Sequence, residues 1–194
     1  MSTVALRRTL IGLVTAAALG AGFVVSPADA AVRRLDDPRG DALAALDISA
    51  VSIRNARSVV TVTLRVPRLE RRRVGGITVF VRRKVAGRPE YAASKVRRGD
   101  RWRTTWQEFG ASRLPCSGLR VRLRERRVVV SIPQRCLGHN RSAVRIQASL
   151  FTRAYLRGNV PDEVVLNPTP GPTLPIDGVP SVRGTRMTPW VAHR

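Results

Sequence analysis

The chain has 194 residues, and its 35 Lys or Arg side chains against 13 Asp or Glu give a formal net charge of +22 at pH 7. This length suits a single hydrophobic core, and so positive a chain attracts anionic surfaces at modest ionic strength. Two cysteines with only His139 near them argue against a zinc site, and the absence of a Gly-rich phosphate loop or a G-x-S-x-G motif argues against the enzyme classes that use them.

The first 30 residues read as a signal peptide. Arg7 and Arg8 precede an apolar run over residues 10–25, and the sequence SPADA then supplies the small residues of an A-x-A cleavage site. The alternative is a membrane anchor that stays attached, but this run is short for about 30 Å of hydrocarbon. We expect cleavage after Ala30, no remaining transmembrane anchor, and a secreted protein that can associate with the cell envelope.

Acidic residues gather directly after the expected cleavage site. They are Asp36, Asp37, Asp41 and Asp47. Their carboxylates are hard oxygen ligands of the kind that Ca²⁺ prefers, although their spacing is not that of an EF-hand loop. The alternative is that they shape turns and pair with neighbouring arginines. Calcium is the one cofactor that the sequence suggests.

Alternating apolar and polar residues dominate the body of the chain and predict β-strands. The expected strands cover 47–55, 58–66, 75–84, 90–98, 101–109, two strands within 118–136, and 143–155. No segment after the signal peptide has a helical period with a cap. About eight short strands joined by polar turns predict an all-β fold, an antiparallel β-sandwich over residues 31–157.

Trp102 and Trp106 lie on the same face of one expected strand, with Thr104 between them. Such a pair is typical of a sandwich core, and it can also stack on the apolar faces of sugar rings. Both interpretations stay open at this stage.

The segment 118–136 predicts a disulfide-clamped hairpin. A two-residue turn at 125–126 pairs Val121 with Val130 and Leu123 with Val128, so that the aliphatic side chains share one face. Cys116 and Cys136 flank this hairpin, and an even cysteine count in an exported protein indicates a disulfide.

The opposite face of this hairpin carries Arg120, Arg122, Arg124 and Arg127. These side chains either form a solvated surface over the core or bind phosphate, sulfate or carboxylate groups through bidentate contacts. The positive charge belongs to the folded body, because residues 48–157 hold 27 basic and 5 acidic side chains.

Residues 158–194 are rich in Pro and Gly and predict an extended C-terminal segment. Trp190 and Val191 form an apolar pair near its end. These last residues are expected to be able to dock on the sandwich as an edge strand.

Several motifs together resemble a known group of proteins. DDPRGDALAALDISAVSI, LPCSGLRVRL, VVVSIPQRCLG and PWVAHR resemble small secreted actinobacterial β-sandwich proteins of uncharacterised function. The opening D-x-x-G-D…D-I pattern, from Asp37 to Ile48, is also similar to the first strand of DOMON-like and carbohydrate-binding sandwich modules. Aspartates near that strand bind calcium in certain of those modules, so the resemblance implies a binding module.

The leading functional hypothesis is a secreted, non-enzymatic binding module for anionic envelope polymers or glycans. The chain has no helix-turn-helix, zinc-finger or aromatic ribonucleoprotein signature, so a sequence-specific nucleic-acid partner is not expected. The alternative is a structural or protein-interaction module whose positive charge is only compositional. A hydrolase is a third hypothesis, for which the sequence offers no catalytic constellation.

Overall fold

A computed structural model describes residues 31–87, 89–109, 113–157, 176–180 and 186–194. The predicted signal peptide lies outside these residues, as do parts 158–175 and 181–185 of the predicted C-terminal segment. Within the described residues, no helix has both the length and the apolar character needed to cross a bilayer.

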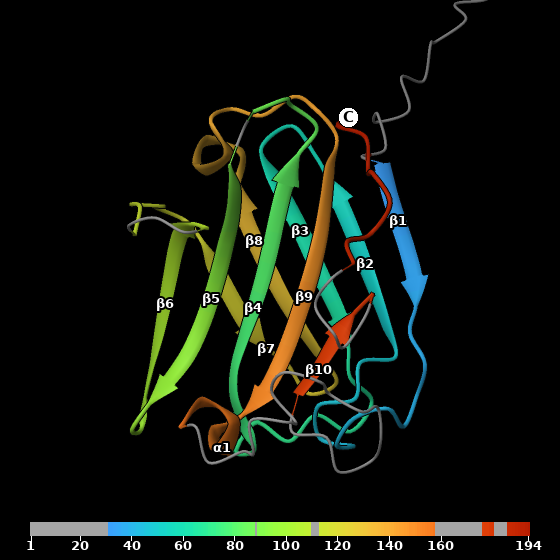
Figure 1. Ribbon diagram of the computed structural model, residues 1–194, viewed down its shortest axis with the longest axis vertical. Helices are drawn as coiled ribbons and strands as arrows, with labels where there is room; N and C mark the ends of the chain where they lie inside the picture. Colours follow the sequence, from blue (N-terminus) through green and yellow to red (C-terminus); the bar gives the residue numbers. More distant parts are fainter. Residues whose placement is uncertain (1–30, 88, 110–112, 158–175, 181–185) are drawn as a thin grey trace, which may run out of the picture.

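Two five-stranded antiparallel sheets pack face to face and form a β-sandwich (Figure 1). In sheet order, sheet A consists of β1 (Ala31–Asp36), β2 (Ala50–Asn55), β3 (Val59–Arg65), β8 (Arg127–Pro133) and β7 (Arg120–Leu123). Sheet B consists of β10 (Ile176–Val179), β9 (Val144–Thr152), β4 (Val74–Arg83), β5 (Glu90–Arg98) and β6 (Arg101–Glu108). The predicted all-β sandwich is confirmed.

The core lies between the sheets, and several strands contribute to it by alternating buried and outward-facing side chains. In β3, Val60, Val62 and Leu64 are fully buried, whereas Thr61 and Thr63 face outward. Side chains of β4 and β9 meet them from sheet B, so that the two inner faces share one continuous core.

The hairpin of β7 and β8 has the predicted register. Val121 lies opposite Val130 and Leu123 opposite Val128, and the Arg124 amide donates to the Arg127 carbonyl at 2.8 Å across the two-residue turn. All three of the valines at 121, 128 and 130 are buried. The apolar side of this hairpin therefore belongs to the core, and its arginines lie on the outer face of sheet A.

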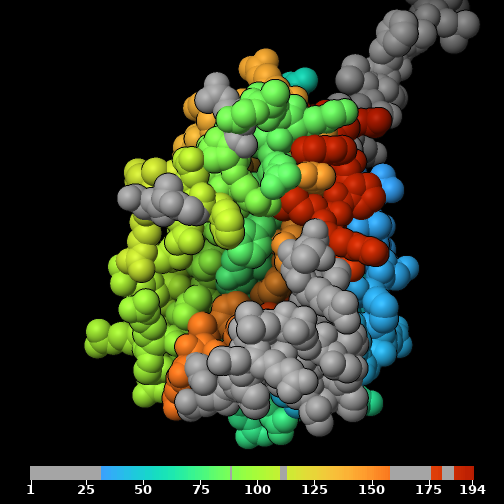
Figure 2. Space-filling view, in the orientation of Figure 1, coloured from blue at the N-terminus to red at the C-terminus, as the bar shows by residue number. Residues whose placement is uncertain are grey.

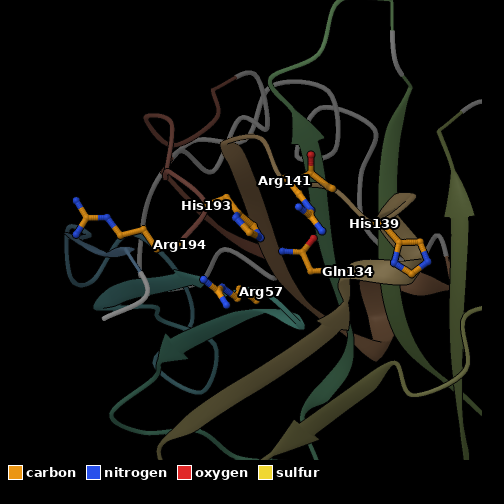
Figure 3. A pocket seen from close by; sticks show the side chains of 7 residues that line it. Arg57, Gln134, His139, Arg141, His193 and Arg194 are labelled. Atoms are coloured by element: carbon orange, nitrogen blue, oxygen red, sulfur yellow. The ribbon is translucent and has the colours of Figure 1, made fainter. Parts of the chain in front are cut away.

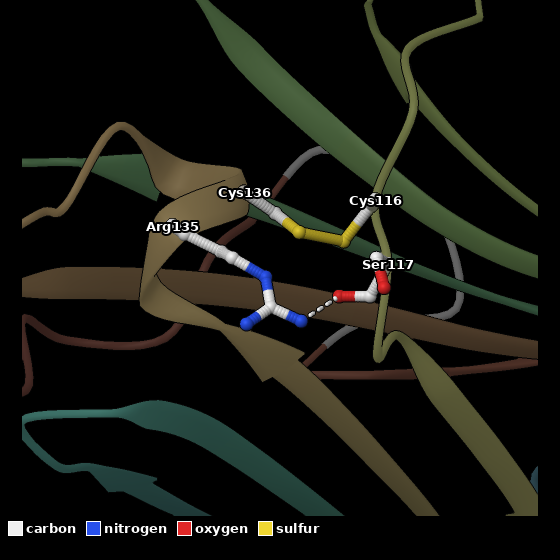
Figure 4. Close-up of a disulfide and its surroundings, with 4 residues drawn as sticks. All are labelled: Cys116, Ser117, Arg135 and Cys136. Atoms are coloured by element: carbon white, nitrogen blue, oxygen red, sulfur yellow. Dashed lines mark hydrogen bonds between the residues drawn. A yellow bond between two sulfur atoms is a disulfide. The ribbon is translucent and has the colours of Figure 1, made fainter.

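The predicted disulfide joins Cys116 to Cys136, with Cα atoms 5.4 Å apart (Figure 4). Cys136 lies in a short 3₁₀ helix, η1 (Gln134–Leu137), which follows β8 directly. The neighbouring Arg135 guanidinium donates to the Ser117 carbonyl at 2.6 Å, so the covalent link and a hydrogen bond connect the same two segments.

The structure adds two edge strands to the eight expected from the sequence. β1 pairs with β2 and forms one edge of sheet A. β10, which comes from the predicted C-terminal segment, pairs with β9 and forms one edge of sheet B. The expected strand 143–155 ends earlier, because Thr152 caps the short helix α1 (Arg153–Leu156) and its Oγ1 accepts from the Tyr155 amide.

The last described residues lie against sheet B. Val191 forms an isolated bridge with Val144, and the Arg145 guanidinium lies 4.8 Å from the Trp190 ring centroid. Figure 2 shows these C-terminal residues in red, beside the green atoms of β4. The C-terminal segment thus supplies both a strand and a surface layer to the sandwich.

Candidate anion-binding groove and carboxylate cluster

The outer face of sheet A collects arginines because of its register. Directly paired residues of antiparallel strands point to the same face, and Arg65 of β3 lies opposite Arg127 of β8. Arg124 follows on the other side of Arg127 across the β7–β8 turn. Three exposed arginines, one from β3 and two from the β7–β8 hairpin, therefore form one row across the sheet.

Two arginines of β7 continue this face along the strand. Arg122 lies opposite Val129 and Arg120 opposite Ser131, and both arginines are exposed. All four arginines singled out in the hairpin therefore project from the same outer surface. Arg120, Arg122 and Arg124 lie at every second position along β7 and into the turn after it, or about 6.6 Å apart, and Arg127 lies opposite Arg124 at the start of β8.

A groove of about 770 Å³ opens on this face where the row of three arginines lies. Small side chains of β2 and β3, among them Ala50, Ser52 and Thr63, line it at the sheet surface. Its charged lining residues are Arg34, Arg65, Arg71, Arg124, Glu125, Arg126 and Arg127. Long basic side chains around short ones make the surface concave and positive.

Most of these guanidinium groups have no acidic partner. Among the described residues, Arg34 is the only arginine of the groove in an ion pair, with Asp36 at 3.3 Å, and both side chains are largely exposed. The remaining arginines keep planar, paired N–H donors that match the oxygen atoms of a phosphate, sulfate or carboxylate.

A second cluster joins two segments that are far apart in the sequence. Asp37, Asp41 and Asp177 each offer a carboxylate oxygen, and these three oxygens lie within 4.8 Å of one another. Asp177, in β10, is fully buried, and its carboxylate accepts hydrogen bonds from the backbone amides of Ile48 and, at 2.7 Å, of Gly178. The loop after β1 and the edge strand β10 therefore meet at these carboxylates.

Burial and mutual repulsion keep these carboxyl groups protonated to unusually high pH. Burial, with a further contribution from Asp41 and Asp37, raises the pKa of Asp177 to about 8. Burial, followed by the charges of Asp41 and Asp47, raises the pKa of Asp37 to about 7, and burial also raises the pKa of Asp41. Near neutral pH the cluster therefore favours a bound proton or a cation over three free charges.

The structure brings together only part of the aspartate set found in the sequence. Asp37 and Asp41 share the cluster, and Asp47 lies beside it, with its Oδ2 accepting from the Gly40 amide at 2.9 Å. Asp36 projects from β1 to solvent and pairs with an arginine. Asp177 was missed, because only its pairing with β9 brings residue 177 near the loop after β1.

These hard carboxylate oxygens suit a divalent cation such as Ca²⁺ chemically. The side chains of Asp37, Asp41 and Asp177 are the ones that would hold it, and Asp47 could complete the set. Calcium binding stays a prediction, which the pH and metal dependence of stability can test.

The two tryptophans on β6 face the inside of the sandwich. Trp106 is 3% exposed and stacks on Tyr91, with ring centroids 5.2 Å apart, so it is a core residue. Trp102 is partly buried, and Lys95 Nζ and Arg97 Cζ lie 5.7 and 5.9 Å from its ring centroid. Its ring is thus already in contact with cations of its own sheet.

Comparisons with protein-family models, curated proteins and solved structures found no match to this chain. The resemblance to secreted actinobacterial sandwich proteins and to DOMON-like modules therefore stays a prediction. The groove and the cluster have to be interpreted from their own geometry.

Proposed function

We propose that the protein is an exported, non-enzymatic binding module that holds an anionic envelope polymer or glycan in the groove of sheet A. One observation carries this proposal: six arginines and a single glutamate surround a concave surface lined by small residues. The Cys116–Cys136 disulfide supports the exported location, because such bonds persist in oxidising compartments.

A polymer fits this surface better than a single small anion does. The arginines continue from the groove along β7 through Arg122 to Arg120, at intervals of about 6.6 Å. A linear chain with repeated phosphate, sulfate or carboxylate groups can contact several guanidinium groups at once. Each exposed contact is weak, and several together give measurable affinity through release of bound counterions.

The alternative is that the positive charge is compositional and that the module serves a structural or protein-interaction role. Under this alternative, any exposed arginine would contribute equally to retention on a polyanion. The two hypotheses therefore differ in whether the position of a charge matters, or only the number of charges.

A pair of matched triple variants tests this difference. The groove variant carries Arg65→Ala, Arg124→Ala and Arg127→Ala. The control variant carries three substitutions on the exposed surface of sheet B, at Arg98, Arg101 and Arg103, each to Ala. Each variant loses three positive charges, so any difference in retention between the two variants reports the contribution of the groove.

Retention on immobilised heparin and on immobilised polyphosphate should be measured over a range of salt concentrations, with neutral dextran as the blank matrix. We expect the groove variant to elute at clearly lower salt, with its slope of log K against log salt reduced by about one for each lost contact. The control should elute close to the parent. The matrix that retains the parent protein to the higher salt concentration indicates which kind of anionic group it prefers.

Equal losses in both variants would favour the compositional alternative, and passage of the parent protein through both matrices at low salt would overturn the proposal. Turnover of envelope glycans or esters by the purified protein would overturn its non-enzymatic part. Duplex DNA should be included as a competitor, since displacement that depends on DNA sequence would indicate a different class of partner.

A further inference from the structure

A second cavity lies at the opposite end of β2 from the groove. Ala50 and Ser52 near the start of β2 line the groove, whereas Arg57, just beyond its end, lines a pocket of about 510 Å³ (Figure 3). The pocket is lined by Arg57, Gln134, His139, Asn140, Arg141, His193 and Arg194. Its volume lies within the range of small-molecule sites.

The lining is rich in hydrogen-bond donors for an anion. Arg57 and Arg141 are exposed, and neither has an acidic partner among the described residues. His193 Nε2 is buried without a hydrogen-bond partner among those residues. Figure 3 shows these three side chains and Gln134 grouped around the middle of the pocket, whereas the Arg194 guanidinium extends outward.

Gln134 adds an acceptor to this set of donors. Its side chain is 3% exposed, and its Nε2 donates to Asn55 Oδ1 and to the Ala56 carbonyl, each at 2.9 Å. These two bonds fix the orientation of the amide, so Oε1 is an acceptor, and it has no donor among the described residues. A buried acceptor without a donor is costly, and a hydroxyl group would satisfy it.

We propose that this pocket is a binding site for a small hydroxylated anion, an acidic sugar or a sugar phosphate. The anionic oxygens bind the guanidinium groups of Arg57 and Arg141, and His193 contributes a further polar contact. A ligand hydroxyl donates to Gln134 Oε1. The site is separate from the groove of sheet A and does not depend on polymer binding there.

Four ligands distinguish the contribution of the anionic group to binding from that of the hydroxyl groups. Glucuronate and glucose 6-phosphate carry both an anionic group and hydroxyls, glucose carries only hydroxyls, and cyclohexanecarboxylate keeps the ring and the carboxylate without hydroxyls. Isothermal titration calorimetry of the full chain should give dissociation constants at least tenfold lower for glucuronate and glucose 6-phosphate than for glucose and cyclohexanecarboxylate. Whichever of glucuronate and glucose 6-phosphate binds more tightly identifies carboxylate or phosphate as the preferred group.

Matched variants locate the binding. Arg57→Ser combined with Arg141→Ser should weaken glucuronate or glucose 6-phosphate binding at least tenfold. The same double change at Arg98 and Arg101, which removes equal charge elsewhere, should leave it within twofold of the parent. The groove variant described above should also bind normally, which separates this site from the proposed polymer groove.

Three outcomes would overturn the proposal. The first is that glucuronate and glucose 6-phosphate both fail to bind at millimolar concentration. The second is that cyclohexanecarboxylate and glucuronate bind with equal affinity. The third is an equal loss of affinity in the pocket and the control variants. Far-UV circular dichroism of each variant checks that it keeps the β-sandwich, so that a loss of binding reports the site.

Discussion

The stability of this protein should fall as the pH rises from 5 to 8, because of the carboxylate cluster. The folded-state pKa values of Asp177 and Asp37 are raised from 3.8 to about 8 and about 7. Over this range the folded chain therefore binds more protons than the unfolded chain, whose carboxyl groups are already ionised. The free energy of unfolding decreases with pH wherever this is so.

The magnitude follows from Asp177, which is fully buried. One proton held only by the folded chain lowers the free energy of unfolding by about 1.4 kcal/mol for each pH unit of increase. Between pH 5 and pH 7, Asp177 alone therefore contributes a loss of at most about 3 kcal/mol. For a domain of this size, the melting temperature should fall by roughly 5–10 °C.

Asp37→Asn tests the assignment to the cluster. The amide of the asparagine can donate to the neighbouring carboxylates at any pH, and it removes one charge from the group. We expect this variant to melt at a higher temperature than the parent at pH 8 and to depend less on pH. Asp36→Asn is the matched control, since Asp36 is adjacent in sequence but its side chain is 80% exposed.

Melting curves from pH 5 to pH 8 in chelator-treated buffer, followed by circular dichroism, measure these effects. Added Ca²⁺ at pH 7.5 should raise the melting temperature of the parent and of Asp36→Asn, and should have less effect on Asp37→Asn. A parent melting temperature that rises between pH 5 and pH 7, or equal pH profiles of the two variants, would refute the reasoning. An unchanged melting temperature with Ca²⁺ would refute only the calcium prediction.

Three further predictions concern the fold. Replacing both Cys116 and Cys136 by serine should destabilise the protein by about 3 kcal/mol, which urea unfolding with and without reductant would show; an effect near zero would contradict the role of the bridge as a clamp. Trp106→Ala should cost about 3–5 kcal/mol in the same assay, because the ring is buried and stacked on an aromatic neighbour, and a loss below about 1 kcal/mol would contradict its place in the core. Gly75→Ala should prevent or strongly weaken folding, since its Cβ would overlap the backbone of β9, and soluble expression with a parent-like melting temperature would show that the two strands can separate at little cost.

Local sequence patterns determined much of the fold. The period-two alternation placed most of the strands of both sheets. The hairpin of β7 and β8 could be registered correctly because a two-residue turn at 125–126 puts Val121, Val128 and Val130 on one face, where all three are buried. The disulfide followed from two cysteines that flank this hairpin. Each of these inferences needed only residues that are close together in the chain.

The edge strands required information that local patterns lack. β1 and β10 are short, and β10 lies in a segment rich in Pro and Gly, so neither carries a strong strand signal. Each forms because a neighbouring strand offers unpaired backbone groups, and which strand does so is a property of the assembled sheet.

The residues of the candidate sites also divide into those that local sequence patterns predict and those that only the tertiary structure reveals. The sequence by itself determined that the hairpin arginines share the outer face, because side-chain alternation within one strand is local. Only the tertiary structure decided that Arg65 completes their row and that Asp177 joins Asp37. Arg65 is 62 positions from Arg127 in the sequence, and Asp37 is 140 positions from Asp177. The pairing of β3 with β8 and of β9 with β10 selects those partners, and it depends on the packing of the whole core.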